Sequence, residues 1–304
     1  MFRSTRGRAG CARFVTIVYG CLSVILLLSS RVLGNENYGN HYSEGNDDFM
    51  VGGAAPPGFY FIDYVNYYTA SKLLDNARNR IPGDFRLDSY SNTFLFLYSS
   101  QLILLGGNLR EVTIVPIVRL HLSTSDRSQT SAGPGDFVLG PSIAWHTKNF
   151  DWSVGGNIIA PVGHYAVNDL ANVGRNYWSV YPVFMATYVS DGGWEASGKF
   201  MYFFNTTNNS NNYRSGQELA LDYLLGKHFW NAAVGINGHY LLQTTDDTQD
   251  GVIVADKKSS FFSVGPAIQY AYGKIAFTLK YQIDVTAKNR PQGQSVWLNF
   301  NFAF

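Results

Sequence analysis

Hydrophobic and polar residues alternate along most of the chain after residue 58. The last stretch, 294–304, shows this most clearly, with Leu298 and Phe300 on one face and Asn299 on the other. Because side chains in a strand point alternately to opposite faces, the pattern predicts a strand with one apolar side. A last strand ending on Phe304 is typical of a barrel in a bacterial outer membrane, where lipid covers the apolar face.

The same reading predicts twelve strands and no helix of useful length. An even strand number is usual for single-chain bacterial barrels. We therefore expect an all-β fold, a transmembrane antiparallel up-and-down β-barrel at 59–304 that follows a short polar segment. The predicted strands are 59–70, 91–105, 109–123, 136–147, 151–163, 176–190, 194–205, 214–227, 230–244, 259–272, 274–287 and 294–304.

The connections between these strands alternate strictly in length. Short turns such as Gly106-Gly107-Asn108 and Asp191-Gly192-Gly193 separate longer polar loops such as 71–90, 164–175 and 245–258. Outer-membrane barrels have short periplasmic turns and longer external loops, so the alternation also predicts the orientation. Charged residues are only 15% of the chain and aromatic residues also 15%, which indicates a surface that is not fully exposed to water.

Charged side chains collect on one parity of several strands, as Glu195 and Lys199 do in 194–205. Charge on the lipid face near mid-membrane costs ~2–4 kcal/mol, so this parity is predicted to face inward. In 109–123 the same rule turns Arg119 and His121 inward. The residues predicted to face outward there are Val112, Ile114, Pro116, Val118, Leu120 and Leu122. The predicted lumen-lining side chains are Arg119, His121, His146, Tyr177, Tyr181, Glu195, Lys199, Glu218, Asp222, His239, Lys280, Asp284 and Trp297.

This inward set contains both signs of charge and allows two interpretations. Fixed dipoles could orient a passing solute, or salt bridges could fill and stabilise a narrow barrel interior. Composition alone leaves both open.

Residues 1–34 have the features of a secretory signal peptide, with a basic start, an apolar run from Phe14 to Leu28 and small residues near Gly34. A membrane anchor is the alternative, but the run is short for a span of ~20 residues. Both cysteines, Cys11 and Cys21, lie in this stretch. Five of the 23 basic residues also lie there, which leaves 18 against 22 acidic residues and excludes a basic nucleic-acid footprint.

Residues 35–58 are polar and rich in Gly and Asn, and they show no period. They are expected to form either a periplasmic leader or a small plug that occupies the lumen and gates it. Gly52, Gly53 and Gly58 are the expected hinge positions, because glycine adopts backbone angles that other residues avoid.

His121 and Ser123 have the spacing of the base and nucleophile in some outer-membrane lipid hydrolases. The residues that follow, Thr124-Ser125-Asp126, do not continue that motif, and an inward-facing pair would not meet lipid. A hydrolase therefore remains an alternative only, and no catalytic residue, metal site or cofactor is predicted.

The stretch from Glu36 to Met50, followed by Pro56-Pro57-Gly58-Phe59-Tyr60-Phe61, Tyr64 and Asn66-Tyr67-Tyr68, resembles the start of the outer-membrane family named for the meta-pathway of phenol degradation. The resemblance extends loosely over the rest of the chain. It implies a barrel transporter for aromatic or other hydrophobic compounds, and it supplies no catalytic residues.

From these observations we expect a channel in the outer membrane for passive uptake of small hydrophobic or aromatic compounds. A structural or adhesive barrel with a filled lumen is the main alternative. The expected partners are outer-membrane lipid and lipopolysaccharide, small hydrophobic solutes, and the barrel-insertion machinery through the strand that ends at Phe304.

Overall fold

The computed structural model describes Glu36, Tyr42 and residues 44–304. Residues 1–34, with the predicted signal peptide, lie outside the described residues. Within the described part of the chain, no helix is long and apolar enough to cross a membrane.

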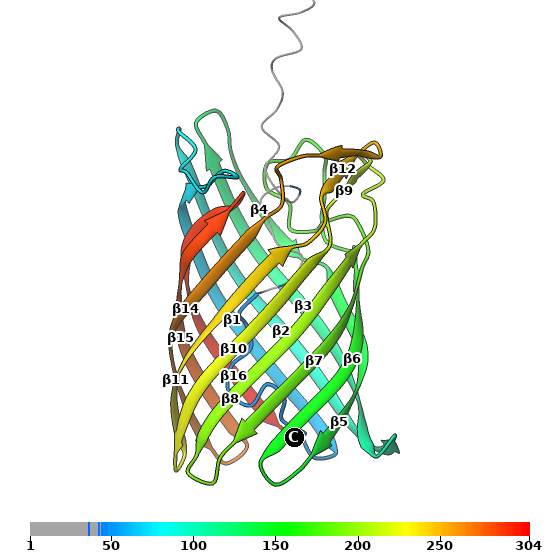
Figure 1. Ribbon diagram of the computed structural model, residues 1–304, viewed down its shortest axis with the longest axis vertical. Helices are drawn as coiled ribbons and strands as arrows, with labels where there is room; N and C mark the ends of the chain where they lie inside the picture. Colours follow the sequence, from blue (N-terminus) through cyan, green and yellow to red (C-terminus); the bar gives the residue numbers. More distant parts are fainter. Residues whose placement is uncertain (1–35, 37–41, 43) are drawn as a thin grey trace, which may run out of the picture. The chain divides into compact units, whose positions relative to one another are not determined.

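The strands form a closed antiparallel barrel of twelve strands with one extra strand, β4, which confirms the predicted fold class (Figure 1). The chain order is kept around the wall, and β1 closes it by pairing with both β2 and β16. The barrel strands are β1 (Gly58–Leu73), β2 (Phe85–Leu104), β3 (Gly107–Thr124), β5 (Phe137–His146), β6 (Phe150–Ala160), β7 (Ser179–Val189), β8 (Trp194–Asn205), β10 (Glu218–Phe229), β11 (Ala232–Gln243), β14 (Ser260–Tyr272), β15 (Ile275–Lys288) and β16 (Pro291–Ala303).

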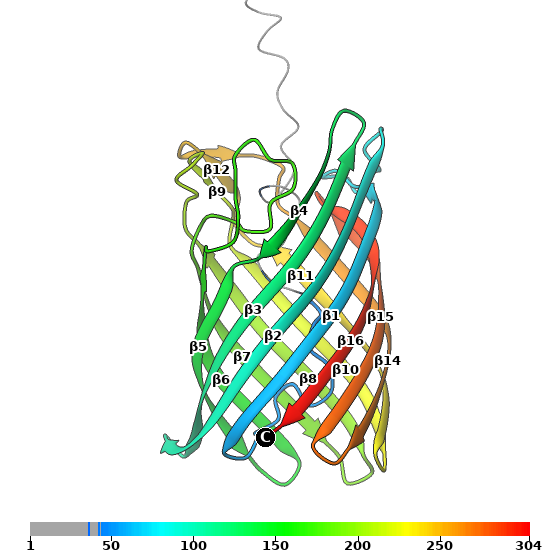
Figure 2. The ribbon, with the colours of Figure 1, turned by 180° about the vertical axis from the view of Figure 1, so that it is seen from behind.

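Each predicted strand corresponds to one of these twelve, with ends that differ by several residues in places. The short turns gather at one end of the barrel with the C-terminus, and the long loops gather at the other (Figures 1 and 2). We call these the turn end and the loop end. The predicted loops contain four further short strands, β4 (Ser128–Pro134), β9 (Tyr213–Arg214), β12 (Asp247–Gln249) and β13 (Val252–Val254); the last three form a separate small sheet.

Side chains on the outer face are apolar along most strands, as the alternation predicts. In β15 and β16, Leu279, Ile283 and Leu298 are exposed, whereas Lys280 and Asn299 are buried inside the barrel. An exposed apolar band on a closed barrel is stable only where lipid covers it.

The strand β3 is the exception, and the predicted inward position of Arg119 and His121 is wrong. Val118 and Leu120 line an internal cavity, so Arg119 and His121 point outward. Both lie toward the loop end, where a charge near the membrane edge costs little, so the mid-membrane rule does not apply there. Apart from Arg110, the inward positions of β3 are apolar, and Ile114 and Leu122 pack in hydrophobic clusters inside the barrel.

Candidate functional site

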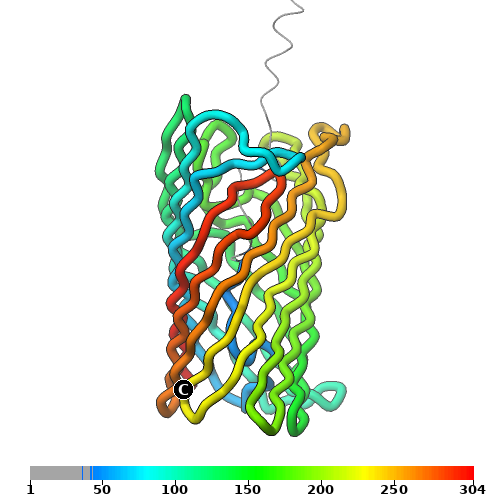
Figure 3. The backbone as a smooth tube through the Cα atoms, turned by 60° about the vertical axis from the view of Figure 1, so that its left-hand side comes forward, coloured from blue at the N-terminus to red at the C-terminus, as the bar shows by residue number. Residues whose placement is uncertain are grey.

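The interior of the barrel is occupied by the polar segment that precedes β1. Tyr42 and residues 44–57 lie inside the wall and lead to Gly58 at the turn end (Figures 1 and 3). We call Glu36, Tyr42 and residues 44–57 the lumen segment.

At the loop end, the lumen segment begins with a clamp on Glu36. The Asn208 amide donates to both carboxylate oxygens of Glu36, at 3.0 and 2.9 Å. Arg175 donates to the Glu36 carbonyl oxygen at 2.9 Å, and the Tyr165 hydroxyl donates to its carboxylate. These partners belong to the long loops, so the lumen segment is fixed at both ends of the barrel.

Tyr42 anchors the lumen segment in an apolar cluster. Its ring packs against Tyr181 and Phe203, at centroid distances of 6.3 and 6.0 Å, beside Ile114 and Met201. Burial of a Tyr side chain on apolar neighbours contributes a few kcal/mol, on the order of 2–3. The barrel therefore has a small hydrophobic core inside the lumen.

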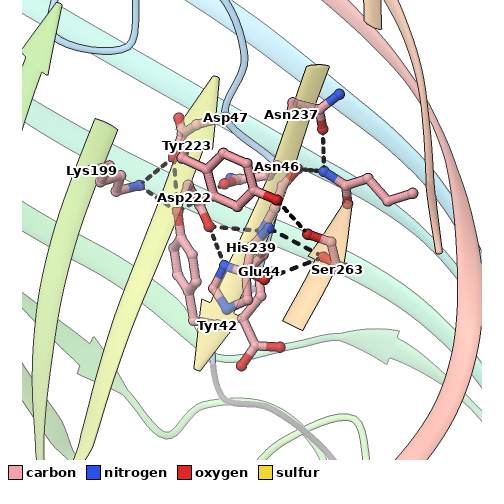
Figure 4. A network of polar contacts seen from close by, with 12 residues as sticks. Tyr42, Glu44, Asn46, Asp47, Lys199, Asp222, Tyr223, Asn237, His239 and Ser263 are labelled. Atoms are coloured by element: carbon pink, nitrogen blue, oxygen red, sulfur yellow. Dashed lines mark hydrogen bonds and ion pairs between the residues drawn. The ribbon is translucent and has the colours of Figure 1, made fainter. Parts of the chain in front are cut away.

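Two lysines hold the turn at residues 45–48. Lys280, which is 1% exposed, donates to the carbonyl oxygens of Gly45, Asn46 and Asp47 at 2.8, 2.7 and 2.8 Å. Lys199 donates to the Asp47 carboxylate at 2.7 Å and to the Tyr42 hydroxyl (Figure 4). Each ammonium group thus receives several acceptors, which offsets the cost of its burial.

Acidic residues of the wall bind the backbone N–H groups of the lumen segment. Asp222 accepts from Gly45 N at 3.0 Å and also contacts His239, as Figure 4 shows. Glu195 accepts from Met50 N at 2.6 Å and also contacts His228. A strand-free segment exposes its amide groups, so these carboxylates replace the ladder partners that it lacks.

These contacts show what four residues of the charged inward set bind. Glu195, Lys199, Asp222 and Lys280 are engaged with the lumen segment, so they bind the protein's own chain. The wall cations face Glu44, Asp47 and Asp48 of the segment; Arg290 lies 3.5 Å from Glu44. Together with the lumen segment, these side chains fill part of the barrel interior.

The other predicted lumen residues lie on the inward side with less involvement in these contacts. Tyr177, Tyr181, Glu218, His239, Asp284 and Trp297 are buried. His146 lies at the rim of the turn end, where it contacts Asp151. Sequence reasoning missed Tyr42, Glu44, Tyr68, Arg110 and Arg290, because no periodicity marks a contact between the lumen segment and the wall.

Two cavities flank the lumen segment. The cavity toward the loop end, which we call the upper cavity, has a volume of about 230 Å³. Four aromatic side chains, Tyr42, Tyr68, Phe261 and Trp297, line it together with many polar ones, such as Asp284 and Arg290. The cavity toward the turn end has a volume of about 410 Å³ and is mostly apolar, with Leu95, Val112, Ile114, Val183 and Met185 opposite Phe49.

The wall beside the upper cavity is closed by a loop instead of a strand. Strand β4 pairs with β3 on one edge, and its other edge contacts the loop 161–178 through Ser131 Oγ, which donates to Ala171 O at 2.6 Å. Gly135 and Val173, on either side of this junction, line the upper cavity. Side-chain hydrogen bonds therefore join the wall at this point in place of a strand ladder.

The hinge glycines do not share one backbone property. Only Gly58 has a positive φ, of 156°, which is close to extended backbone. Gly52 instead permits a close approach, because a Cβ there would lie 2.4 Å from the backbone carbon of Ala186. Its amide also donates to Thr187 Oγ1 at 2.9 Å.

The predicted hydrolase pair lies on the outer face of β3, with no lumen contact. His121 Nδ1 lies 2.9 Å from Thr130 Oγ1. No hydrogen bond joins His121 to Ser123 among the residues that the structure describes. In the same part of the chain, no group of His, Cys, Asp or Glu side chains is arranged to hold a metal ion.

A barrel with an apolar outer band, polar ends and an interior occupied by its own N-terminal segment is an outer-membrane type of fold. The chain belongs to the family described as "Putative MetA-pathway of phenol degradation", whose model matches residues 70–300. This confirms the family resemblance seen in the sequence.

A solved structure shows the same fold. The chain is similar to the COG4313 outer membrane channel from Pseudomonas putida F1, with a TM-score of 0.75 and 17% identity over 83% of this chain and 97% of that one. It is more distantly similar to the translocator domain of autotransporter NalP from Neisseria meningitidis, with a TM-score of 0.47 and 8% identity over 83% of this chain and 90% of that one. The CymD monoaromatic hydrocarbon channel gives a TM-score of 0.44 and 8% identity over 82% of this chain and 89% of that one. No curated protein matches the sequence.

Proposed function

We propose that this protein is an outer-membrane channel through which small hydrophobic or aromatic compounds diffuse inward. The observation that carries the proposal is the lumen itself, in which a cavity with aromatic and polar lining residues and a larger, mostly apolar cavity lie on either side of a segment held by polar contacts. The channel named among the solved structures with the same fold supports the transport class.

The aromatic side chains of the upper cavity and the apolar lining of the larger cavity favour an apolar solute that carries a polar group. A water-filled pore offers an apolar solute no affinity, whereas side chains such as Trp297 and Met185 bind it weakly and reversibly. Conduction requires binding that is strong enough for entry and weak enough for exit. A few polar groups, such as Asp284 and Arg290, would orient a phenol-like hydroxyl in the upper cavity.

Solutes enter the upper cavity where the loop 161–178 closes the wall beside β4. An apolar compound partitions into the outer leaflet, so entry from the side shortens its path through water. Ser131 and Gln129 contact the loop through three hydrogen bonds, which cost less to break than a strand ladder.

The lumen segment acts as the gate between the two cavities. Its movement breaks the contacts of Lys199 and Lys280 and opens a path to the turn end, which short turns mark as periplasmic. Gly52, Gly53 and Gly58 are the positions about which it moves.

Export and insertion follow the usual route of such barrels. The signal peptide at 1–34 directs export, the strand ending at Phe304 is recognised by the insertion machinery, and phospholipid and lipopolysaccharide surround the apolar band.

The test is solute flux through the purified protein reconstituted in liposomes. A phenol-sized aromatic and a sugar-sized polar solute are compared in the wild-type chain and in a variant that lacks residues 38–55. We expect faster entry of the aromatic in the wild type and faster entry of both solutes in the deletion variant.

Other outcomes distinguish the alternatives. Equal entry of both solutes in the wild type would indicate a general pore. No entry of either would favour a structural or adhesive barrel with a filled lumen. Unchanged flux after the deletion would refute the gating role of the lumen segment, but not the proposal that the barrel is a channel.

A further inference from the structure

The hairpin between β2 and β3 ends in four consecutive large apolar residues, Leu102 to Leu105. Their side chains are 45–81% exposed, and Leu105 is the most exposed of them. Consecutive residues of a hairpin point to both faces, so the tip is apolar all round and has no lumen-facing side. We call residues 100–108 the apolar finger.

Three of the other turns at the same end of the barrel carry charged residues. Lys148 and Asp191, in the β5–β6 and β7–β8 turns, form an ion pair at 2.9 Å on the surface. The β14–β15 turn carries Lys274. The apolar finger contains no charged residue, so it differs from these three turns; the remaining turn, β10–β11, exposes Phe229 and Trp230.

A bulge directs the apolar finger away from the barrel axis. Between the pairs Ser99–Arg110 and Ile103–Asn108, β2 has three residues where β3 has one. Extra residues in one strand bend a hairpin and re-aim its tip. Figures 1, 2 and 3 show the tip projecting sideways from the wall, near the level of the C-terminus and above the lowest turns.

Two contacts with β5 fix this direction. The Trp145 indole N–H donates to the Leu105 carbonyl oxygen at 3.1 Å. Gly107 lies so close to β5 that a Cβ there would be 2.7 Å from the Ala144 carbonyl oxygen. Trp145 also stacks on Trp152, so the base of the apolar finger continues into an aromatic patch.

The tip keeps a leucine where the turn favours another residue. Leu105 and Gly106, between the paired residues Leu104 and Gly107, have φ values of 51° and 81°. A two-residue turn with both φ values positive favours Asn-Gly, and a leucine there is strained. Leu105 is exposed, so packing within the described chain does not offset this strain.

We propose that the apolar finger is a lipid anchor, which inserts Leu102 to Leu105 among the acyl chains of the phospholipid leaflet at the turn end. Lipid is the occupant because the tip projects sideways at the edge of the barrel. It also continues the outward apolar side of β2, where Phe96 and Tyr98 are exposed. The strained leucine is then an apolar side chain held at the furthest point of the tip. This anchor requires only the barrel in a bilayer and is independent of solute transport.

The test uses a fluorophore attached to the tip. In a Cys11→Ser, Cys21→Ser background the protein has no other cysteine, so Leu105→Cys can be labelled with an environment-sensitive dye. Leu104→Cys, which has an ordinary backbone conformation, gives a second label site if the strained position folds poorly. Asp191→Cys in the polar β7–β8 turn is the matched control. The labelled proteins are reconstituted in phosphatidylethanolamine and phosphatidylglycerol vesicles.

We expect spin-labelled lipids to quench the dye at 104 or 105 several-fold more than at 191, and aqueous iodide to show the opposite order. Equal iodide quenching at the tip and at 191 would place the finger in water and overturn the proposal. Protection from both quenchers would also overturn it, since protein, such as a second copy, would then cover the tip.

Discussion

Lys199 and Asp47 form a buried ion pair inside the barrel, with 2.7 Å between the ammonium nitrogen and a carboxylate oxygen. Lys199 belongs to the wall and Asp47 to the lumen segment, so the pair joins the fixed and the movable part of the proposed gate. Removing one partner of a buried pair leaves an uncompensated charge and costs about 3–5 kcal/mol.

The first prediction concerns this pair. Asp47→Asn leaves Lys199 buried without its carboxylate partner. The lumen segment should therefore dissociate from the barrel wall more often. Single-channel recordings in planar bilayers should show higher conductance or more frequent opening. The double variant Asp47→Asn, Lys199→Met should recover part of the wild-type behaviour, because it removes both charges. A conductance that stays at the wild-type level in all three proteins would contradict the role of this pair.

Gly52 gives a second, steric test of the same segment. Gly52→Ala places a Cβ against the backbone of β7, and overpacking of this kind costs about 1–3 kcal/mol. The lumen segment should therefore be displaced and flux should rise. Gly156→Ala is the matched control, because a Cβ at that β6 position meets nothing within 4 Å. Equal flux in the two variants would mean that the close contact at Gly52 does not hold the segment.

A third prediction concerns pH. Burial raises the pKa of Glu44, which precedes the first membrane-spanning strand, well above its usual value of 4.5, and Arg290 opposes this only in part. A carboxyl group with a raised pKa favours its neutral form in the folded state. The lumen segment is therefore held most firmly below pH 4.5 and less firmly as the pH rises toward the raised pKa.

Conductance measured across that range should increase with pH in the wild-type protein. Glu44→Gln keeps the neutral form at every pH and should flatten this part of the profile. If the variant and the wild type show the same profile, other groups govern the response.

The fourth prediction separates the channel from a lipid hydrolase. Ser123→Ala should leave both solute flux and lipid composition unchanged, because Ser123 has no hydrogen bond to His121 in the described structure. Fatty-acid release from phospholipid vesicles is the measurement. Release by the wild-type protein that disappears in Ser123→Ala would establish an enzyme instead.

The sequence predicted the wall of the barrel far better than its contents. Glu195, Lys199 and Asp222 are buried inside the barrel. Lys199 and Asp222 lie in the middle of β8 and β10, where lipid excludes charge, whereas Glu195 lies near the turn end. Arg119 points outward, but it lies toward the loop end, where an outward charge costs little free energy. Ile114 was expected to face lipid, but an apolar side chain satisfies an apolar interior equally well, and hydropathy cannot distinguish the two environments.

The lumen segment was harder to predict for a different reason. Its contacts join residues far apart in sequence, such as Gly45 with Lys280 and Glu44 with Arg290, and they satisfy the backbone of an irregular chain. The hydrophobic periodicity of the sequence does not predict such contacts. The apolar finger, by contrast, is visible in the sequence as Leu102 to Leu105, but only the bulge beside Ser99 shows that it leaves the barrel wall.

The path of the lumen segment has a consequence for biogenesis. Glu36 is clamped by loops at one end of the barrel, and Gly58 starts β1 at the other, so the segment runs the length of the enclosure that β1 and β16 complete. Feeding a chain through a finished ring would require passing Tyr42 and its charged neighbours along the whole bore. Laying it down while the seam between β1 and β16 is still open avoids that passage. The last step of assembly is then the pairing of β1 with β16 around the lumen segment. The position of this segment inside the barrel therefore implies an order of folding.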